Sequence, residues 1–111
     1  MTPEGRIKKS INDLIATYGD QIYKFMPVPG GFGASSLDYI LCVQGIFVSI
    51  EAKKPGGKPT ARQIFTIRQI KQSGGKTFVI DGDASLAMLM QFLDWVLAAP
   101  RTPQDVRKWP T

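Results

Sequence analysis

The sequence predicts a single α/β domain in which helices flank a mixed sheet. Apolar residues recur at helical spacing near both ends of the chain, while short, strongly apolar runs bounded by glycine and proline fill its middle. A further helical segment separates the third predicted strand from the fourth. The predicted order is therefore α-β-β-β-α-β-α, with the domain at residues 1–99 and a polar tail at residues 100–111.

The first half of the chain predicts a helix, a strand and a β-hairpin. Thr2-Pro3-Glu4 is typical of a helix start, and Gly19 is typical of the position just past a helix end. Residues 21–28 predict a strand and residues 29–36 a loop of small residues. The run 37–43 predicts a strand buried on both faces, with Cys42 inside, and Gln44-Gly45 a tight turn into a strand at 46–53.

The second half predicts two helices around one more strand. Thr60 caps a helix that Gly74-Gly75 ends, a strand follows at 77–80, and Asp83 caps an apolar helix at 84–98. The strand at 77–80 follows a helical crossover, which favours parallel pairing with a hairpin strand. The apolar residues of segment 86–97 spread beyond one stripe, which indicates a buried helix or a homodimer interface.

Composition excludes several kinds of chemistry. The 111 residues contain no histidine, which excludes Ser-His-Asp and Cys-His nucleophiles and histidine zinc sites. The single cysteine excludes an internal disulfide and a cysteine zinc knuckle. A net charge of +5 favours an anionic partner such as nucleic acid. The chain has no apolar run long enough to cross a membrane, and residues 1–10 are polar and basic with no apolar run behind them, so we expect no signal peptide and a cytoplasmic protein.

The predicted hairpin brings two acids and a lysine to one end of the sheet. With Gln44-Gly45 as the turn, the pairing places Asp38 opposite Glu51, and Lys53 shares their face. Opposed carboxylates repel unless a cation lies between them, and all-oxygen ligands suit Mg²⁺ or Mn²⁺. Lys53 would orient or deprotonate a water, or neutralise charge on a phosphate. The spacing alone also fits an ordinary cross-strand Glu–Lys ion pair with a nearby acid.

Basic residues surround this predicted site. Lys54, Lys58 and Arg62 follow it in the adjoining loop and helix start, and Lys8 and Lys9 extend a possible DNA-facing surface from the first helix. Phosphodiester hydrolysis needs an activated water beside cations that hold the backbone. A solvated surface is the alternative interpretation for any one of these charges.

The stretch from Asp38 to Lys53 has the form D-x(12)-E-x-K, which resembles the signature of the PD-(D/E)XK nucleases, on the matching order α-β-β-β-α-β of a restriction-endonuclease-like core. More narrowly, the chain resembles the VRR-NUC (virus-type replication-repair nuclease) family over about residues 3–82. Four features carry this resemblance: Glu4 in the first helix, Leu37-Asp38, Ile50-Glu51-Ala52-Lys53, and Thr60-Ala61-Arg62-Gln63.

The resemblance implies a role for each matching residue. Asp38, Glu51 and the backbone carbonyl of Ala52 would be metal ligands, and Glu4 an outer carboxylate that reaches a metal directly or through water. Lys53 would be the catalytic lysine and Gln63 an auxiliary polar residue of the catalytic site. Many relatives have Gly-x-Pro-Asp where this chain has Ser35-Ser36-Leu37-Asp38, and Ser35 or Ser36 would instead bind a phosphate or the DNA backbone.

Together with these residues, the resemblance implies a metal-dependent DNA endonuclease of a bacterial cell or phage-infected host, acting on branched or four-way junction DNA in replication, recombination or repair. A symmetric junction would match a homodimer. Two alternatives remain open at this stage: a non-catalytic nucleic-acid-binding module on the same fold, and a small interaction protein whose 86–97 helix docks a partner.

Overall fold

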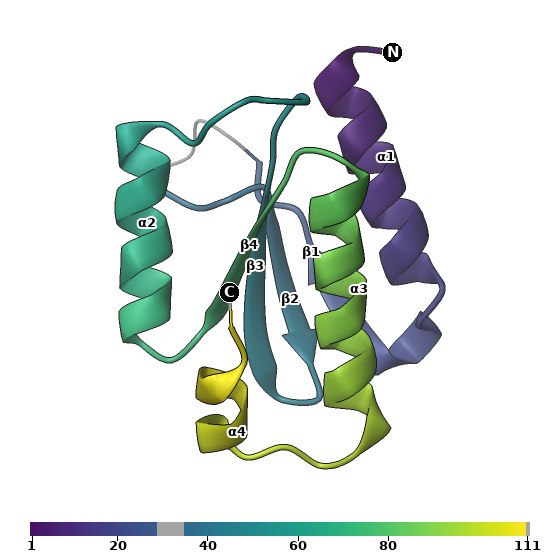
Figure 1. Cartoon of the computed structure of the whole chain (residues 1–111), viewed down its shortest axis with the longest axis vertical. Coiled ribbons are helices and arrows are strands. Elements are labelled where there is room, and N and C mark those ends of the chain that lie inside the picture. Colours follow the sequence, from purple (N-terminus) through teal and green to yellow (C-terminus); the bar gives the residue numbers. More distant parts are fainter. Residues whose placement is uncertain (29–34, 111) are drawn as a thin grey trace.

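The computed structural model describes residues 1–28 and 35–110, and in these ranges the chain forms a mixed four-stranded sheet in the order β1-β2-β3-β4 (Figure 1). The strands are β1 (Ile22–Phe25), β2 (Tyr39–Val43), β3 (Ile46–Ala52) and β4 (Lys76–Ile80). The first three pair antiparallel, and β4 lies parallel to β3. The predicted α/β class with a mixed sheet is confirmed, while residues 29–34 of the predicted loop lie outside the described ranges.

Helices cover both faces of this sheet. The helices α1 (Pro3–Ala16) and α3 (Asp83–Ala98) pack side by side on one face, and α2 (Ala61–Gln72) lies on the other (Figure 1). The core lies between the sheet and the α1/α3 pair, where alternate strand residues meet apolar helix residues. Its fully buried side chains include Tyr39, Leu41, Val43, Val48, Ile50 and Ile80 from the sheet, Ile11 from α1, and Leu89, Phe92 and Leu93 from α3.

The hairpin has the predicted register. Val43 pairs with Ile46 and Tyr39 with Ile50 across β2 and β3. Gln44 and Gly45 both adopt positive φ angles, 52° and 83°, as a two-residue turn with primed geometry requires. The two-residue turn therefore sets the pairing of β2 residues with β3 residues along the whole hairpin.

The face of β2 that points away from α1 and α3 is less buried than predicted. Cys42 is exposed, so the strand is not buried on both faces. The helix α2 contacts β4, at the far edge of the sheet, and leaves Tyr23, Phe25 and Phe47 of the same sheet face largely exposed. A continuous apolar run cannot reveal this, because burial depends on which strands a distant helix covers.

Element boundaries also shift by a few residues. A 3₁₀ turn at Gly19–Gln21 precedes β1, which ends at Phe25 rather than at residue 28. The strand β2 starts at Tyr39 rather than at residue 37. The N-cap of α3 is Gly82, so Asp83 is the first helical residue rather than the cap.

The C-terminal segment is not a polar tail. After α3, residues Pro103–Lys108 form a helix, α4, started by a reciprocal Thr102–Asp105 capping box. Val106 is only 2% exposed, and the Trp109 ring lies 4.8 Å from that of Trp95. The polar composition of the segment led to the prediction of a tail. Val106 and Trp109 are nevertheless three residues apart, which places them on one side of a helical turn. The packed core therefore extends beyond residue 99.

Most apolar residues of the 86–97 segment pack into this protein's own core. Leu89, Phe92, Leu93 and Val96 face the sheet, while Met88 and Met90 remain 54% and 41% exposed. No helix among residues 1–28 and 35–110 combines the length and apolar character needed to cross a bilayer.

Candidate active site

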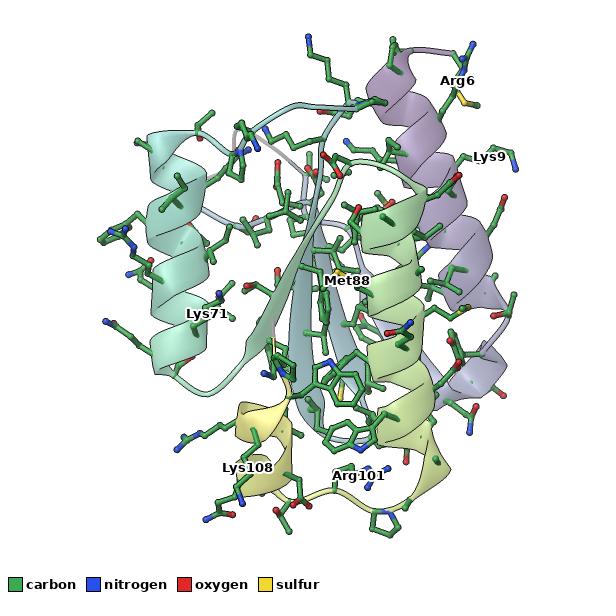
Figure 2. All side chains as sticks on the ribbon, viewed as in Figure 1. Arg6, Lys9, Lys71, Met88, Arg101 and Lys108 are labelled. Atoms are coloured by element: carbon green, nitrogen blue, oxygen red, sulfur yellow. The ribbon has the colours of Figure 1, made fainter. Side chains whose placement is uncertain are left out.

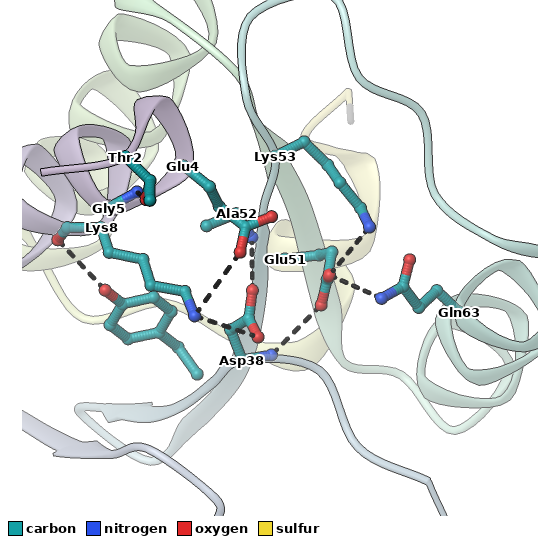
Figure 3. Close-up of polar contacts among 10 residues, drawn as sticks. Thr2, Glu4, Gly5, Lys8, Asp38, Glu51, Ala52, Lys53 and Gln63 are labelled. Carbon is teal, nitrogen blue, oxygen red and sulfur yellow. Dashed lines mark hydrogen bonds and ion pairs between the residues drawn. The ribbon is translucent and has the colours of Figure 1, made fainter. Parts of the chain in front are cut away.

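Asp38 and Glu51 face each other where the hairpin opens, next to the N-terminal ends of α1 and α2 (Figure 3). Two hydrogen bonds join the segment at Asp38 to the end of β3 here. The Asp38 backbone N–H donates to Glu51 Oε1 at 3.3 Å, and the Ala52 backbone N–H donates to Asp38 Oδ2 at 2.9 Å. The close approach of these two acids agrees with the opposition that the turn predicts.

Glu51 is a buried carboxylate with few balancing charges. The residue is only 3% exposed, and its Oε2 lies 3.5 Å from Lys53 Nζ. Burial, followed by the charge of Asp38, raises the pKa of Glu51 above its ordinary value, although Lys53 acts in the opposite direction. Negative charge at this end of the sheet is therefore only partly neutralised by the protein.

Gln63 contacts the same Glu51 oxygen as Lys53. Its Nε2 donates to Glu51 Oε2 at 2.7 Å. Its Oε1 accepts the Thr60 backbone N–H at 2.9 Å, and its own backbone N–H donates to the Thr60 hydroxyl, which completes a capping box. One amide thus starts α2 and orients the buried acid.

Lys53 projects from the end of β3 on the same face as Glu51, as predicted. Its backbone N–H donates to the Ile80 carbonyl at 2.9 Å, which continues the pairing with β4. The chain then turns sharply, with the Gly57 N–H bonded to the Lys54 carbonyl at 2.8 Å. The lysine side chain is 15% exposed, which is more than the 4% of the Glu51 side chain that it pairs with.

The helix α1 supplies a cation to the other side of Asp38. Lys8 Nζ lies 3.8 Å from Asp38 Oδ1 and 3.9 Å from Glu4 Oε2. The Tyr39 hydroxyl donates to the Lys8 carbonyl at 3.2 Å and ties α1 to the hairpin. Burial and then the Asp38 charge raise the pKa of Tyr39 to about 12, so the hydroxyl stays protonated. Glu4 is connected to Asp38 through Lys8.

The position of Lys8 differs from the prediction, which placed it only on a DNA-facing surface. The spacing of Glu4 and Lys8 by four residues signals an ion pair along α1. Contact between Lys8 and Asp38 has no comparable signal, because it depends on how α1 packs against the hairpin.

A small, hard divalent cation fits the central group of residues. Two carboxylates face each other beside the Ala52 backbone, and oxygen ligands of this kind are those that Mg²⁺ and Mn²⁺ prefer. The described residues contain no cluster of three acidic, cysteine or histidine side chains suited to a metal. Any ion would therefore rely on Asp38, Glu51, backbone oxygen and water, with Glu4 released from Lys8 if it takes part.

The predicted DNA-binding residues divide into two groups. Lys54, Lys58 and Arg62 are exposed around the Lys53 side of the site, and none belongs to an ion pair within the described ranges. Ser35 and Ser36 are also exposed, and the buried Leu37 separates them from Asp38. They line a hollow of 190 Å³ between the sheet and α2, together with apolar residues that include Phe47 and Ile70.

Lys9 does not join this surface. It points away from the sheet on the outer side of α1 (Figure 2), where its ammonium group lies 2.7 Å from Asp13 Oδ2. The structure therefore brings together Asp38, Glu51, Ala52, Lys53 and Gln63, places Lys8 and Glu4 beside them, and leaves Lys9 apart.

No protein-family model matches the chain, and no curated protein matches it either.

Proposed function

We propose that this protein is a metal-dependent DNA endonuclease that hydrolyses phosphodiester bonds. The observation that carries the proposal is the buried Glu51 held against Asp38, with Lys53 on the same face. Such an arrangement costs folding free energy, because burial and a like charge both disfavour the carboxylate. A site for a divalent cation accounts for that cost, and the D-x(12)-E-x-K resemblance agrees with it.

In this proposal each residue has a separate task. Asp38, Glu51 and the Ala52 carbonyl would hold Mg²⁺ or Mn²⁺, which when bound supplies Lewis acidity to the phosphate and to the attacking water. Gln63 keeps Glu51 in one orientation. Lys53 orients the water, accepts its proton, or balances the charge that develops on the phosphate.

The surroundings support a nucleic-acid substrate. Lys54, Lys58 and Arg62 would contact backbone phosphates beside the site, and Ser35 and Ser36 would donate hydrogen bonds to the same strand. The net charge of +5 favours association with a polyanion. We propose branched or four-way junction DNA as the substrate, a homodimer as the acting species, and the cytoplasm of a bacterial cell or phage-infected host as its location.

The deciding experiment replaces Lys53 with methionine. The purified variant and wild type are incubated with labelled single-stranded, duplex, flap and four-way junction DNA in Mg²⁺ or Mn²⁺. We expect the K53M variant to cleave at least about 100-fold more slowly, since one electrostatic or acid–base group is removed. Lys24→Met is the matched control. Lys24 lies on β1, donates a hydrogen bond to Asn12 of α1, and is outside the proposed site.

Equal cleavage by wild type and K53M, with both melting at similar temperatures, would refute the proposed mechanism. A non-catalytic DNA-binding module is the second candidate, favoured by the exposed cations around the site. It predicts salt-dependent DNA binding that gains nothing from divalent metal, and no cleavage by wild type of any DNA in the panel.

A further inference from the structure

A second concave site lies at the end of the sheet opposite Glu51. The hollow has a volume of 290 Å³ and is formed where the C-terminal turn of α2, the start of β4 and the helix α4 meet (Figure 1). Its lining consists of Lys71, Gly74, Gly75, Lys76, Arg107 and Trp109. Figure 2 labels Lys71 at the lower end of α2, just above the helix that carries Lys108.

This hollow is positively charged without a carboxylate to balance it. Three of its lining residues are cations, and none forms an ion pair with an acid anywhere in the part of the chain that the structure describes. Lys76 is only 6% exposed, and its Nζ donates to the Trp109 carbonyl. Buried lysines are normally matched by an anion, and one carbonyl leaves most of that charge uncompensated.

The electrostatics at Lys76 agree with this geometry. Burial and the nearby charge of Lys71 lower the pKa of Lys76 below its ordinary value. No acidic group contributes to that shift. An anion in the hollow would oppose both effects at once.

The backbone allows the cations to converge. Gly74 has a φ angle of +95°, and a Cβ atom there would lie 3.1 Å from a guanidinium nitrogen of Arg107. A side chain at this position would therefore be both strained and in the way of the guanidinium. The glycine lets Arg107 approach the α2–β4 turn, beside Lys71 and Lys76.

We propose that this hollow is a second phosphate-binding site, which holds a backbone phosphate of the DNA whose cleaved phosphate lies at Asp38 and Glu51. This inference rests on the proposed function. Val79 pairs with Glu51, and Lys76 starts the same edge strand three residues earlier, about 10 Å away along the strand and with its side chain on the opposite face of the sheet, toward α4. Successive phosphates of one DNA strand advance by about 3.4 Å along the helix axis, so DNA bound at Asp38 and Glu51 that continues along the β4 edge presents further phosphates within this distance. Arg62 and Arg68 on α2 are exposed.

The test measures DNA binding in EDTA, so that it does not depend on cleavage. The double variant Lys71→Gln/Arg107→Gln removes two exposed cations of the hollow, while Lys108→Gln removes a neighbouring α4 cation that does not line it. Fluorescence anisotropy with four-way junction DNA is recorded over a series of salt concentrations. We expect the double variant to bind five- to tenfold more weakly, with a salt slope smaller by about one, and K108Q to bind like wild type.

Thermal melts with inorganic phosphate test whether the hollow binds a free phosphate ion as well as a phosphate of the DNA backbone. In thermal melts, phosphate should stabilise wild type more than the double variant if the hollow accepts an isolated phosphate group. Equal DNA affinity and equal salt slope for wild type and double variant would overturn the inference. That conclusion would hold even if free phosphate stabilised wild type, because the hollow would then bind phosphate but not DNA. Weaker binding of the double variant supports it even if no DNA is cleaved, which would count against the proposed function alone.

Discussion

Replacing Asp38 with asparagine should stabilise the metal-free protein while abolishing its proposed activity. Asparagine keeps a carbonyl oxygen that can accept the Ala52 N–H, now bonded to Asp38 Oδ2 at 2.9 Å. The second oxygen lies 3.8 Å from Lys8 Nζ, beyond hydrogen-bond distance, so an amide NH₂ group there meets no close donor. The substitution therefore removes one of two opposed charges and little else.

The expected gain follows from Coulomb's law. Side chains opposed across a hairpin lie about 5 Å apart, at which two like charges repel by about 3 kcal/mol with an effective dielectric constant of 20. Loss of the partly exposed Lys8–Asp38 attraction removes at most about 1 kcal/mol. Some solvation of Asp38 is also lost, so we expect a net stabilisation of about 1–2 kcal/mol, or about 4–8 °C in Tm.

Thermal and urea unfolding in EDTA measure this gain. Asp13→Asn is the matched control, because Asp13 pairs with Lys9 on the surface and its loss should change stability by less than about 0.5 kcal/mol. Adding Mn²⁺ should then raise the Tm of wild type more than that of D38N. A D38N protein that is no more stable than wild type in EDTA would refute the claim that these carboxylates repel each other.

Three further predictions concern the rest of the fold. Val106→Ala should lower the free energy of unfolding by about 2 kcal/mol in urea titrations, whereas a loose C-terminal tail would give no change. Gly45→Ala should lower it by about 1 kcal/mol, because a φ of 83° strains alanine although no atom blocks its Cβ; an unchanged Cm would contradict this. If α3 forms a homodimer interface, Met88→Glu combined with Met90→Glu should convert the dimer to a monomer in light scattering, and a monomeric wild type would exclude it.

The candidate site was predictable because it follows from local geometry. Gln44 and Gly45 specify a two-residue turn, and the period of two along each strand then places Asp38, Glu51 and Lys53 on one face. No contact between distant segments is needed for that step. The sheet's mixed character was likewise predictable, since a helical crossover before residue 77 favours parallel pairing.

The features that could not be predicted depend on packing between distant elements. Burial of Cys42 required a helix over β2, but α2 contacts β4 instead. The C-terminal segment reads as polar, yet Val106 and Trp109 find an apolar surface formed by α3 and the sheet. Neither outcome is present in the local sequence pattern, because each depends on where another segment lies.

The position of α2 shows why the site and the fold cannot be separated in this protein. The helix has a single buried residue, Thr66, so apolar burial fixes it only weakly against the sheet. At its N-terminal end, Gln63 joins the capping box to the Glu51 carboxylate through one amide. A change in the charge or hydrogen bonding of Glu51 therefore acts on the placement of α2, and with it on Arg62 beside the site and Lys71 at the second hollow. Any divalent ion that holds Glu51 would, by the same contacts, hold the helix that carries these cations.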